Sequence, residues 1–297
     1  MGDKLVGVVG LGIMGAAMAN RQASSKRRST ADLVRLYLQD IGRVDLLSHE
    51  EELTLARLVQ KREQLVVERR GLCSKHPDVA RLEALEEQRL RETSKLGHQP
   101  SQSQWAQACG LSAAELRAQV QAGNKAWAEL LNMSPGDLQR QLLHGRRAKE
   151  RMIQANLRLV VAVAKKYQHR GMELLDLVQE GTLGLERGVE KYDPTRGFRF
   201  STYAYWWIRQ GITRAIATQS RTIRLPVHIT EKLNRIKKAQ RDIASRLGRT
   251  ATLKDLSQEL QLSEDVVRQT LMRVPRSVSL DTRVGRDMDT ELGDLLE

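Results

Sequence analysis

The 297-residue sequence predicts an all-α protein with more than one domain. Helix-start signatures recur along the chain, each with a Ser or Thr followed three residues later by a polar side chain that can bond back to the backbone. From residue 31 onward, no stretch alternates apolar and polar residues between hairpin turns as a strand would. The length suggests about two domains, since a domain has roughly 150 residues.

The first 30 residues differ in character from the rest. Residues 4–20 contain Gly10-x-Gly12-x-x-Gly15 and resemble the start of the beta-hydroxyacid dehydrogenases, where such a turn admits a dinucleotide. That site also needs a second strand ending in an acidic residue about 20 positions later, but residues 21–30 are basic and lack it. The apolar run resembles a secretory signal as well, but it is too short to span a bilayer. We therefore expect a flexible leader at residues 1–30, with no cofactor and no membrane attachment.

Further along the chain, several residues are expected to start or end helices. The expected capping residues are Ser48, Ser101, Ser112, Ser134 and Thr252. Pro135 follows Ser134 at the first helical position, where its missing N–H costs nothing. Another helix is expected to begin at Pro226 and to end at Gly248, because glycine readily adopts the left-handed cap.

Two stretches of the chain resemble each other, since residues 96–117 align without gaps on residues 247–268. They share a Leu-Gly opening, a capping Ser or Thr, one glutamine, and a Leu-Ser pair followed by Arg. Both predict a helix, a tight turn and a helix, which is the framework of a helix-turn-helix domain. Such a framework can place a helix in the major groove of DNA or can simply pack three helices together. We weigh the two interpretations equally for the second copy and favour packing for the first, where the sequence is less basic.

Charge and cysteine content limit the classes of function. The net charge of +13 indicates a polyanionic partner, such as nucleic acid or an acidic membrane face. Residues 194–250 hold 13 Lys and Arg but only two acidic residues, whereas residues 281–297 hold six acidic residues and two Arg. Cys73 and Cys109 are too few for a metal cage or a disulfide framework. We expect reduced thiols in a cytoplasmic protein that binds no metal.

Six of the eleven aromatic residues fall within residues 198–207. On a helix beginning near Ser201, one face would carry Tyr203, Trp206 or Trp207, Gln210, Thr213 and Arg214, and the other face Ala204, Ile208, Ile212, Ala215 and Ile216. Rings beside Arg196, Arg199 and Arg209 would offer planes for bases and cations for phosphates, which suits single-stranded nucleic acid. The alternative is an aromatic core cluster with a solvated basic rim.

Four consecutive blocks resemble those of a bacterial primary-type sigma factor, the subunit that directs RNA polymerase to promoters. The blocks are residues 156–167, 174–194, 196–216 and 221–236. Residues 32–59 are similar to the region that precedes these blocks in the family, and residues 277–297 to the acidic linker that follows them. The resemblance is closest to the non-essential, primary-like group of cyanobacteria. It implies a helical initiation factor with no catalytic residues and no cofactor.

The resemblance also implies partners and site residues. Core RNA polymerase would bind, through its beta-prime coiled coil, to Asp176, Gln179 and Glu180. The minus-10 element of promoter DNA would be melted by Phe198, Phe200, Tyr203, Trp206 and Trp207, which capture flipped bases. Its paired part would be read by Gln210, Thr213 and Arg214, while Arg221, Arg224, His228 and Glu231 would hold phosphates and read an extended minus-10 element. An anti-sigma factor is a further candidate partner.

The family pattern also divides the chain. Residues 31–222 would form domain 2 with its preceding region and a variable spacer at about 70–147, residues 223–276 domain 3, and residues 277–297 the linker. Thr182 and Glu186 replace the asparagine and apolar residue usual in the family. The family continues into a domain that reads the minus-35 element, so this chain is expected to depend on extended minus-10 promoters. A truncated sigma fragment and a helix-turn-helix regulator without initiation activity are the alternatives.

Overall fold

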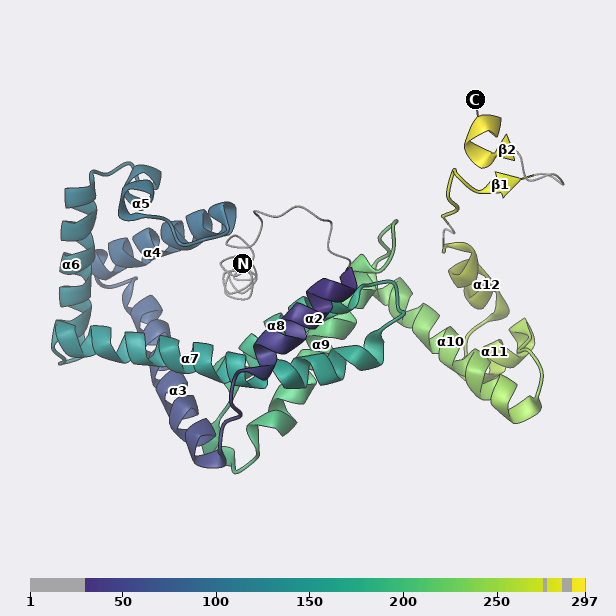
Figure 1. Cartoon of the computed structure of the whole chain (residues 1–297), viewed down its shortest axis with the longest axis horizontal. Coiled ribbons are helices and arrows are strands. Elements are labelled where there is room, and N and C mark those ends of the chain that lie inside the picture. Colours follow the sequence, from purple (N-terminus) through teal and green to yellow (C-terminus); the bar gives the residue numbers. More distant parts are fainter. Residues whose placement is uncertain (1–29, 275–276, 285–289, 297) are drawn as a thin grey trace. The chain divides into compact units, whose positions relative to one another are not determined.

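The computed structural model describes residues 30–274, 277–284 and 290–296, and most of them are helical (Figure 1). The expected all-α fold class is therefore confirmed. One short ladder is an addition that we did not predict: β1 (Arg283–Val284) and β2 (Thr290–Glu291) pair antiparallel. Strands of two residues are too short for alternation to reveal them. The glycine motif within residues 4–20 lies outside the described residues.

The chain forms two compact units. The first contains α2 (Thr30–Gly42), α3 (His49–Leu72), α4 (Pro77–Leu96), α5 (Gln102–Ala108), α6 (Ala113–Leu130), α7 (Pro135–Ala164), α8 (Leu174–Lys191) and most of α9 (Phe200–Gln219). The second contains the end of α9, then α10 (Val227–Leu247), α11 (Leu253–Leu260), α12 (Glu264–Met272) and the ladder. The units divide after Thr213, inside α9, so the domain division expected at residue 222 stays a prediction.

The expected helix starts agree with the structure. Complete capping boxes begin α3 at Ser48, α5 at Ser101, α6 at Ser112 and α11 at Thr252. Ser134 accepts a hydrogen bond from the backbone N–H of Asp137 at 3.1 Å, with Pro135 at the first helical position. These local bonds satisfy backbone donors that a helix end otherwise leaves unpaired. Sequence signals of this kind are reliable because both partners lie within one turn.

The spacer between α3 and α7 packs around two apolar clusters, one of which it shares with these two helices. Trp127 on α6 is completely buried and packs with Leu82 on α4 and Leu138 on α7. Trp105 on α5 is 8% exposed, and its indole N–H donates to the carbonyl of Leu85 at 3.0 Å. Both tryptophans are thus core residues.

The internal repeat corresponds to two three-helix modules. We call α4 to α6 the spacer module and α10 to α12 the second module. The first helix of each ends in a left-handed glycine, Gly97 with φ 75° and Gly248 with φ 65°. Trp105 in the spacer module and Leu256 in the second module occupy the same aligned position, and each packs in the core of its own module. The predicted helix-turn-helix-like domain after the aromatic segment is therefore present as a three-helix unit.

No helix among the described residues is long and apolar enough to cross a membrane.

Candidate nucleic-acid interface

The inner face of α9 is a continuous apolar stripe. Ala204, Ile208 and Ile212 are completely buried, as the periodicity predicted. A side chain on Gly211 would put its Cβ 2.6 Å from the carbonyl oxygen of Glu180, and one on Gly184 would collide with the carbonyl of Trp207. Glycines at these two places let the backbones of α8 and α9 approach closely. This packing fixes which face of α9 is left open.

The open face of α9 carries the aromatic rings and two polar side chains. Trp206 is 60% exposed, Tyr203 and Trp207 are half-buried, and Gln210 and Thr213 are exposed. The rings of Tyr203 and Trp207 meet edge to face, with centroids 6.2 Å apart. The sequence predicted a face with Tyr203, Trp206 or Trp207, Gln210, Thr213 and Arg214, and the exposure of these residues is consistent with that prediction.

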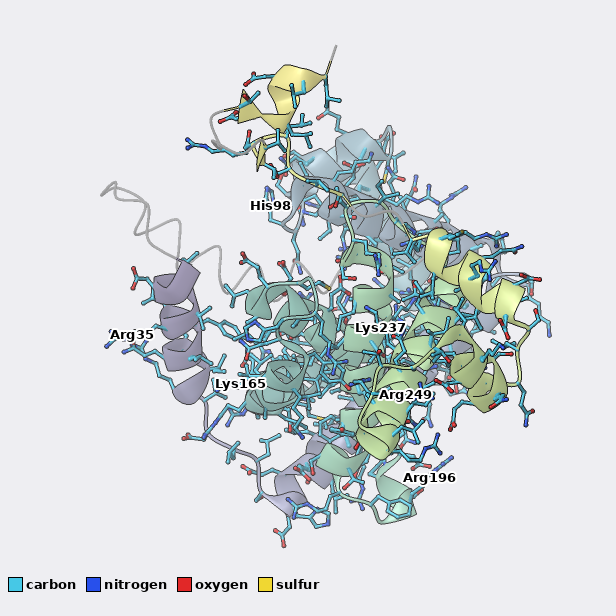
Figure 2. All side chains as sticks on the ribbon, turned by 90° about the vertical axis from the view of Figure 1, so that its right-hand side faces the viewer. Arg35, His98, Lys165, Arg196, Lys237 and Arg249 are labelled. Atoms are coloured by element: carbon cyan, nitrogen blue, oxygen red, sulfur yellow. The ribbon has the colours of Figure 1, made fainter. Side chains whose placement is uncertain are left out.

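Cations lie close to both tryptophans of this face. The guanidinium of Arg209 lies 5.5 Å from the Trp206 ring centre, and the Lys191 ammonium lies 5.0 Å from that of Trp207. Such contacts hold cations beside the rings, where a nucleic-acid phosphate could reach them. Arg196 and Arg199 are also exposed in the turn before α9, and Figure 2 labels Arg196.

The turn before α9 presents Phe198 to solvent. The Tyr192 hydroxyl donates to the carbonyl of Phe198 at 2.6 Å, and the Tyr203 hydroxyl donates to the carbonyl of Lys191 at 3.2 Å. Gly197 has φ 73°, a left-handed conformation that favours glycine. Burial is the main cause that raises the pKa of Tyr192 above its ordinary value. Phe198 itself is 67% exposed.

Phe200 corrects the predicted set of DNA-facing aromatics. Its side chain is completely buried and meets the Tyr192 ring edge to face at 5.2 Å. A ring buried in this way cannot stack on a base while the segment keeps this fold. Phe200 anchors the first turn of α9, and the expectation that it contacts DNA is wrong for this conformation. The alternative of an aromatic core cluster therefore holds for Phe200 and Tyr192, but not for Phe198 and Trp206.

The outer face of α8 carries the three residues expected to bind core polymerase. Asp176 is exposed, and Gln179 and Glu180 are half-buried at i+3 and i+4. The opposite side of the helix is buried through residues such as Leu177 and Leu185. The three polar side chains therefore lie on one face, directed away from the apolar core.

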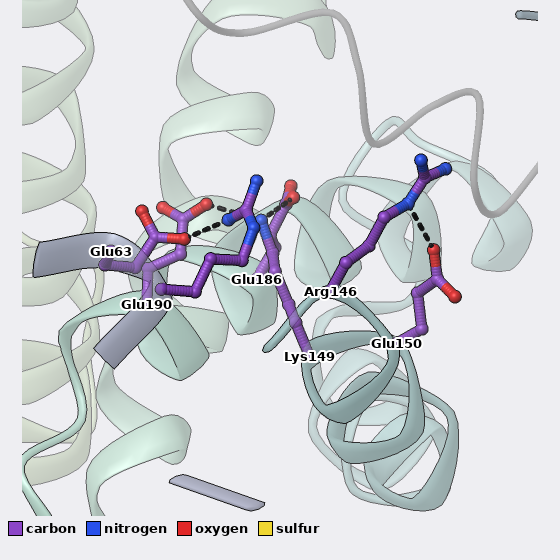
Figure 3. A network of polar contacts seen from close by, with 7 residues as sticks. Glu63, Arg146, Lys149, Glu150, Glu186 and Glu190 are labelled. Carbon is purple, nitrogen blue, oxygen red and sulfur yellow. Dashed lines mark hydrogen bonds and ion pairs between the residues drawn. The ribbon is translucent and has the colours of Figure 1, made fainter. Parts of the chain in front are cut away.

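The two departures from the family pattern on α8 point inward. Thr182 is buried, and its hydroxyl donates to the carbonyl of Val178 at 2.8 Å. The Nζ of Lys149 on α7 forms ion pairs with Oε1 of Glu186 at 2.6 Å and with Oε1 of Glu190 at 2.5 Å (Figure 3). Burial raises the pKa of Glu186 despite the opposing effect of Lys149. Burial alone would lower the pKa of Lys149, but the two carboxylates outweigh it and raise that pKa. Glu186 is therefore an ionic link between α7 and α8.

The second unit holds the other predicted DNA contacts. Arg214, Arg224, His228 and Glu231 are exposed, while Arg221 is half-buried. A guanidinium nitrogen of Arg224 donates to the carbonyl of Thr218 at 3.2 Å. A pocket of about 200 Å³ is lined by Ser220, Arg221, Thr222, Ile223 and Ser277.

The first turns of α10 are held by an apolar contact. Leu225, Ile229 and Leu233 pack together, with Val274 against them. Because these side chains face inward, His228 and Glu231 project from the other side.

Among the described residues, no group of three or more His, Cys, Asp or Glu side chains could hold a metal ion.

Comparison with known proteins identifies the family. Residues 32–65 match Sigma-70 factor, region 1.2, residues 152–222 match Sigma-70 region 2, and residues 231–297 match Sigma-70 region 3. The RNA polymerase sigma-C factor of Nostoc sp. is 58% identical over 289 residues, covering 97% of this chain and 69% of that protein. This chain belongs to the sigma-70 family. RNA polymerase sigma factor SigA2 of Synechococcus elongatus is 50% identical over 275 residues, covering 93% of this chain and 73% of that protein.

Sigma-70 factors are transcription initiation factors rather than enzymes, and they work with RNA polymerase and promoter DNA. In this sigma factor, the matched region 2 contains the whole of α8 and α9. It contains only one side of the ionic link between Glu186 and Lys149, since Lys149 precedes residue 152. The matched region 3 begins at Glu231, so His228 lies just before it. The dehydrogenase resemblance of residues 4–20 has no counterpart in these matches.

Sequence reasoning missed several supporting residues of this sigma factor. Tyr192 and Lys191 end α8, yet they hold Phe198 and Trp207. Glu52 on α3 is 6% exposed, and one of its carboxylate oxygens lies 3.7 Å from Nε of Arg199. Tyr192 lies six residues before Phe198, where the aromatic run begins, and this proximity was a signal that could have pointed to its role. Glu52 lies about 150 residues from Arg199, so no local pattern could have revealed their contact.

Proposed function

We propose that this sigma factor binds core RNA polymerase and opens promoter DNA at the minus-10 element, by capturing flipped non-template bases on aromatic side chains. The exposure of Phe198 and Trp206 carries this proposal. They are 67% and 60% exposed while Ile208 and Ile212 are buried on the other side of α9. Large aromatic rings that are exposed to this extent are suited to stacking on the bases of a nucleic acid.

Melting by this face needs no fuel molecule. Unstacking one base step costs a few kcal/mol, and each base restacked on a side chain returns about 1–3 kcal/mol. Trp206, Trp207, Tyr203 and Phe198 offer the planes, and Arg209 supplies a cation beside them for the strand's phosphates. Gln210 can pair with an adenine edge through both its amide atoms, and Thr213 lies one turn further along α9.

The other predicted contacts complete the proposed promoter complex. Asp176, Gln179 and Glu180 would bind the beta-prime coiled coil, because acidic and amide groups on one helix face suit a basic partner. In the second unit, Arg214, Arg221 and Arg224 would hold phosphates. His228 and Glu231 would read an extended minus-10 element. A specific anti-sigma partner stays a prediction.

The alternative of a stand-alone helix-turn-helix regulator has less support. In such a regulator the last helix of the module enters the major groove by its first turn. Here that helix is α12, and its first turn carries Glu264 and Asp265. Two carboxylates at that end would be repelled by the flanking phosphates. A regulator would also have no use for the exposed rings of α9.

The proposal is tested on the assembled holoenzyme with a minus-10 promoter fragment carrying a fluorescent adenine analogue. We expect Tyr203→Ala combined with Trp206→Ala to reduce strand opening at low temperature at least tenfold, because each lost stacking plane is worth about 1–3 kcal/mol. Binding of core polymerase should be unchanged. Fluorescence of the analogue reports the opening.

Two control variants make this result interpretable. Trp206→Phe keeps an aromatic plane and should retain most of the opening. Met272→Ala removes another exposed apolar side chain, 77% exposed on α12, and should have no effect. If the double alanine variant opens the promoter as well as the unmodified protein does, the melting role of the α9 face is wrong.

A further inference from the structure

The spacer module meets α3 and α7 at a place where polar side chains are buried among apolar ones. Arg69 comes from α3, Glu83 from α4, Trp127 from α6 and Gln141 from α7, and we call these four residues the buried polar cluster. The guanidinium of Arg69 lies 5.0 Å from the ring centre of Trp127, which is completely buried. Gln141 follows Leu138 by about one turn of α7, and Leu138 packs in the same apolar core as Trp127. Side chains from four helices therefore meet around one indole ring.

Each member of the buried polar cluster has a buried polar atom with no hydrogen-bond partner among the described residues. Two of these atoms carry a donor hydrogen, Nε of Arg69 and the indole nitrogen of Trp127, and two are acceptors, Oε1 of Gln141 and Oε2 of Glu83. Oε2 of Glu83 lies 2.6 Å from a terminal nitrogen of Arg69, which balances its charge without making a well-directed hydrogen bond. Elsewhere in the described chain, only Glu52 has such an atom. Because native proteins pair nearly all buried polar groups, this concentration needs an explanation.

The other tryptophan of the spacer module has a different arrangement. The indole N–H of Trp105 donates directly to the backbone carbonyl of Leu85 at 3.0 Å. Trp127 is buried more deeply than Trp105, yet no carbonyl of the described chain accepts its N–H. The module can therefore pair a buried indole through the protein alone, but it does not do so at Trp127. An acceptor from outside the chain is the remaining way to satisfy this donor.

We propose that one ordered water molecule binds in the buried polar cluster and joins α3, α4, α6 and α7. The water oxygen accepts from Nε of Arg69 and from the indole nitrogen of Trp127, and its two hydrogens go to Gln141 and Glu83. Two donors and two acceptors match the hydrogen-bonding capacity of a water molecule, and buried waters typically make about three such bonds. An apolar occupant would leave all four groups unpaired. Glu83 would repel an anion and Arg69 would repel a cation, so a neutral molecule fits best.

The proposed water site belongs to a part of the chain that the family matches do not cover. All four residues lie within 66–151, between the matched regions 1.2 and 2. A water held by α3, α4, α6 and α7 ties the spacer module to the two long helices on either side of it. Its loss should therefore loosen this junction more than the interior of any single helix.

The test is NMR of the full chain with nitrogen-15 in its tryptophan indoles. A water that stays bound while the protein tumbles gives a nuclear Overhauser effect of opposite sign to that from freely exchanging water. We expect the bound-water sign at the N–H of Trp127 and the exchanging-water sign at the exposed Trp206. Trp105 should give no water signal, because its N–H already has a protein acceptor. Trp127→Phe identifies the Trp127 signal by removing it.

A second variant changes the site while keeping the indole. Gln141→Met removes one acceptor at similar size, so the bound-water signal of Trp127 should be lost or weakened severalfold. The midpoint of urea unfolding of the spacer module should fall as well, because buried donors are then left unpaired. Gln139→Met is the matched control, since Gln139 is exposed on the same helix, and it should change neither measurement.

Three results would overturn the inference. The first is the absence of a bound-water signal at Trp127 in the unmodified protein. The second is an unchanged signal in Gln141→Met, which would place the water outside the buried polar cluster. The third is the same signal at Trp105, which would mean that water reaches every indole of the module. None of these measurements involves DNA or polymerase, so the proposed function is tested separately.

Discussion

The spacer module and the second module have the same frame and opposite surfaces. Each begins with a long helix that ends in a left-handed glycine, continues with a short capped helix, and closes with a third helix that starts at a serine. Residues 77–130 hold six basic and seven acidic residues, whereas residues 227–272 hold nine basic and six acidic residues. A few buried positions and caps specify the frame. The charge on its outside then decides which partner it can meet.

This contrast limits what a helix-turn-helix pattern indicates. In the spacer module Trp105 and Trp127 enlarge the core, and Glu86 and Glu87 pair with arginines on the same helix. In the second module the core is built from smaller residues such as Leu256 and Val267. The favoured interpretation of the first copy as a packing module agrees with its core and charge.

The largest expected difference between the modules concerns their cores. Trp105→Ala should destabilise the spacer module by about 3–5 kcal/mol, and Leu256→Ala should destabilise the second module by about 2–5 kcal/mol, because each leaves a cavity in a buried cluster. Amide hydrogen exchange would measure the effect for each helix separately. Loss of protection should be confined to the module that carries the substitution. Loss in both modules from either variant would contradict the view that each has its own core.

A smaller difference is expected at the turn before the third helix. Gly110 in the spacer module has φ 67°, and Gln261 at the aligned position has φ 52°. The left-handed conformation costs a residue with a side chain about 1–2 kcal/mol. Gln261→Gly should therefore stabilise the second module by about 1 kcal/mol, whereas Gly110→Gln should destabilise the spacer module by a similar amount. Urea denaturation would measure both, and changes of the same sign would refute the shared turn geometry.

The smallest expected difference appears in acid, at the short middle helices. Hydrogen bonds from Arg249 and from Thr252 hold the pKa of Asp255 well below its ordinary value of 3.8. A lowered folded-state pKa means that this cap stabilises α11 fully above the ordinary value and less as the pH falls below it. The matching cap of α5 uses Gln104, which does not titrate. Hydrogen exchange between about pH 5 and pH 2 should show lost protection at α11 but not at α5. Asp255→Asn should abolish the difference, and acid sensitivity that survives this substitution would exclude the cap as its cause.

Much of the fold could be predicted because its determinants are local. Ser48, Ser101, Ser112 and Thr252 each cap a helix through a partner three residues away. The periodicity of Ala204, Ile208 and Ile212 correctly identified the inner face of α9. Each of these signals depends on residues within one or two helical turns, so it can be read before the chain is folded.

The candidate site was predicted only in part. The sequence brought Phe198, Phe200 and Trp206 together as one aromatic group, but only Phe198 and Trp206 are exposed. Which ring of a dense cluster is buried depends on Tyr192, whose hydroxyl holds the Phe198 carbonyl and whose ring packs on Phe200. Which ring is buried therefore depends on the path of the turn between α8 and α9, and helical periodicity gives no information about that path.

By itself, the sequence determined the helical class, the helix starts, the two modules and the concentration of cations and rings in one segment. Tertiary structure alone decided that Glu186 serves an ionic link to Lys149, that Glu52 lies beside Arg199, and that Phe200 is a core residue. The reason is physical. Helix formation and capping are short-range along the chain, whereas burial and ion pairing depend on residues that only the packed fold brings together.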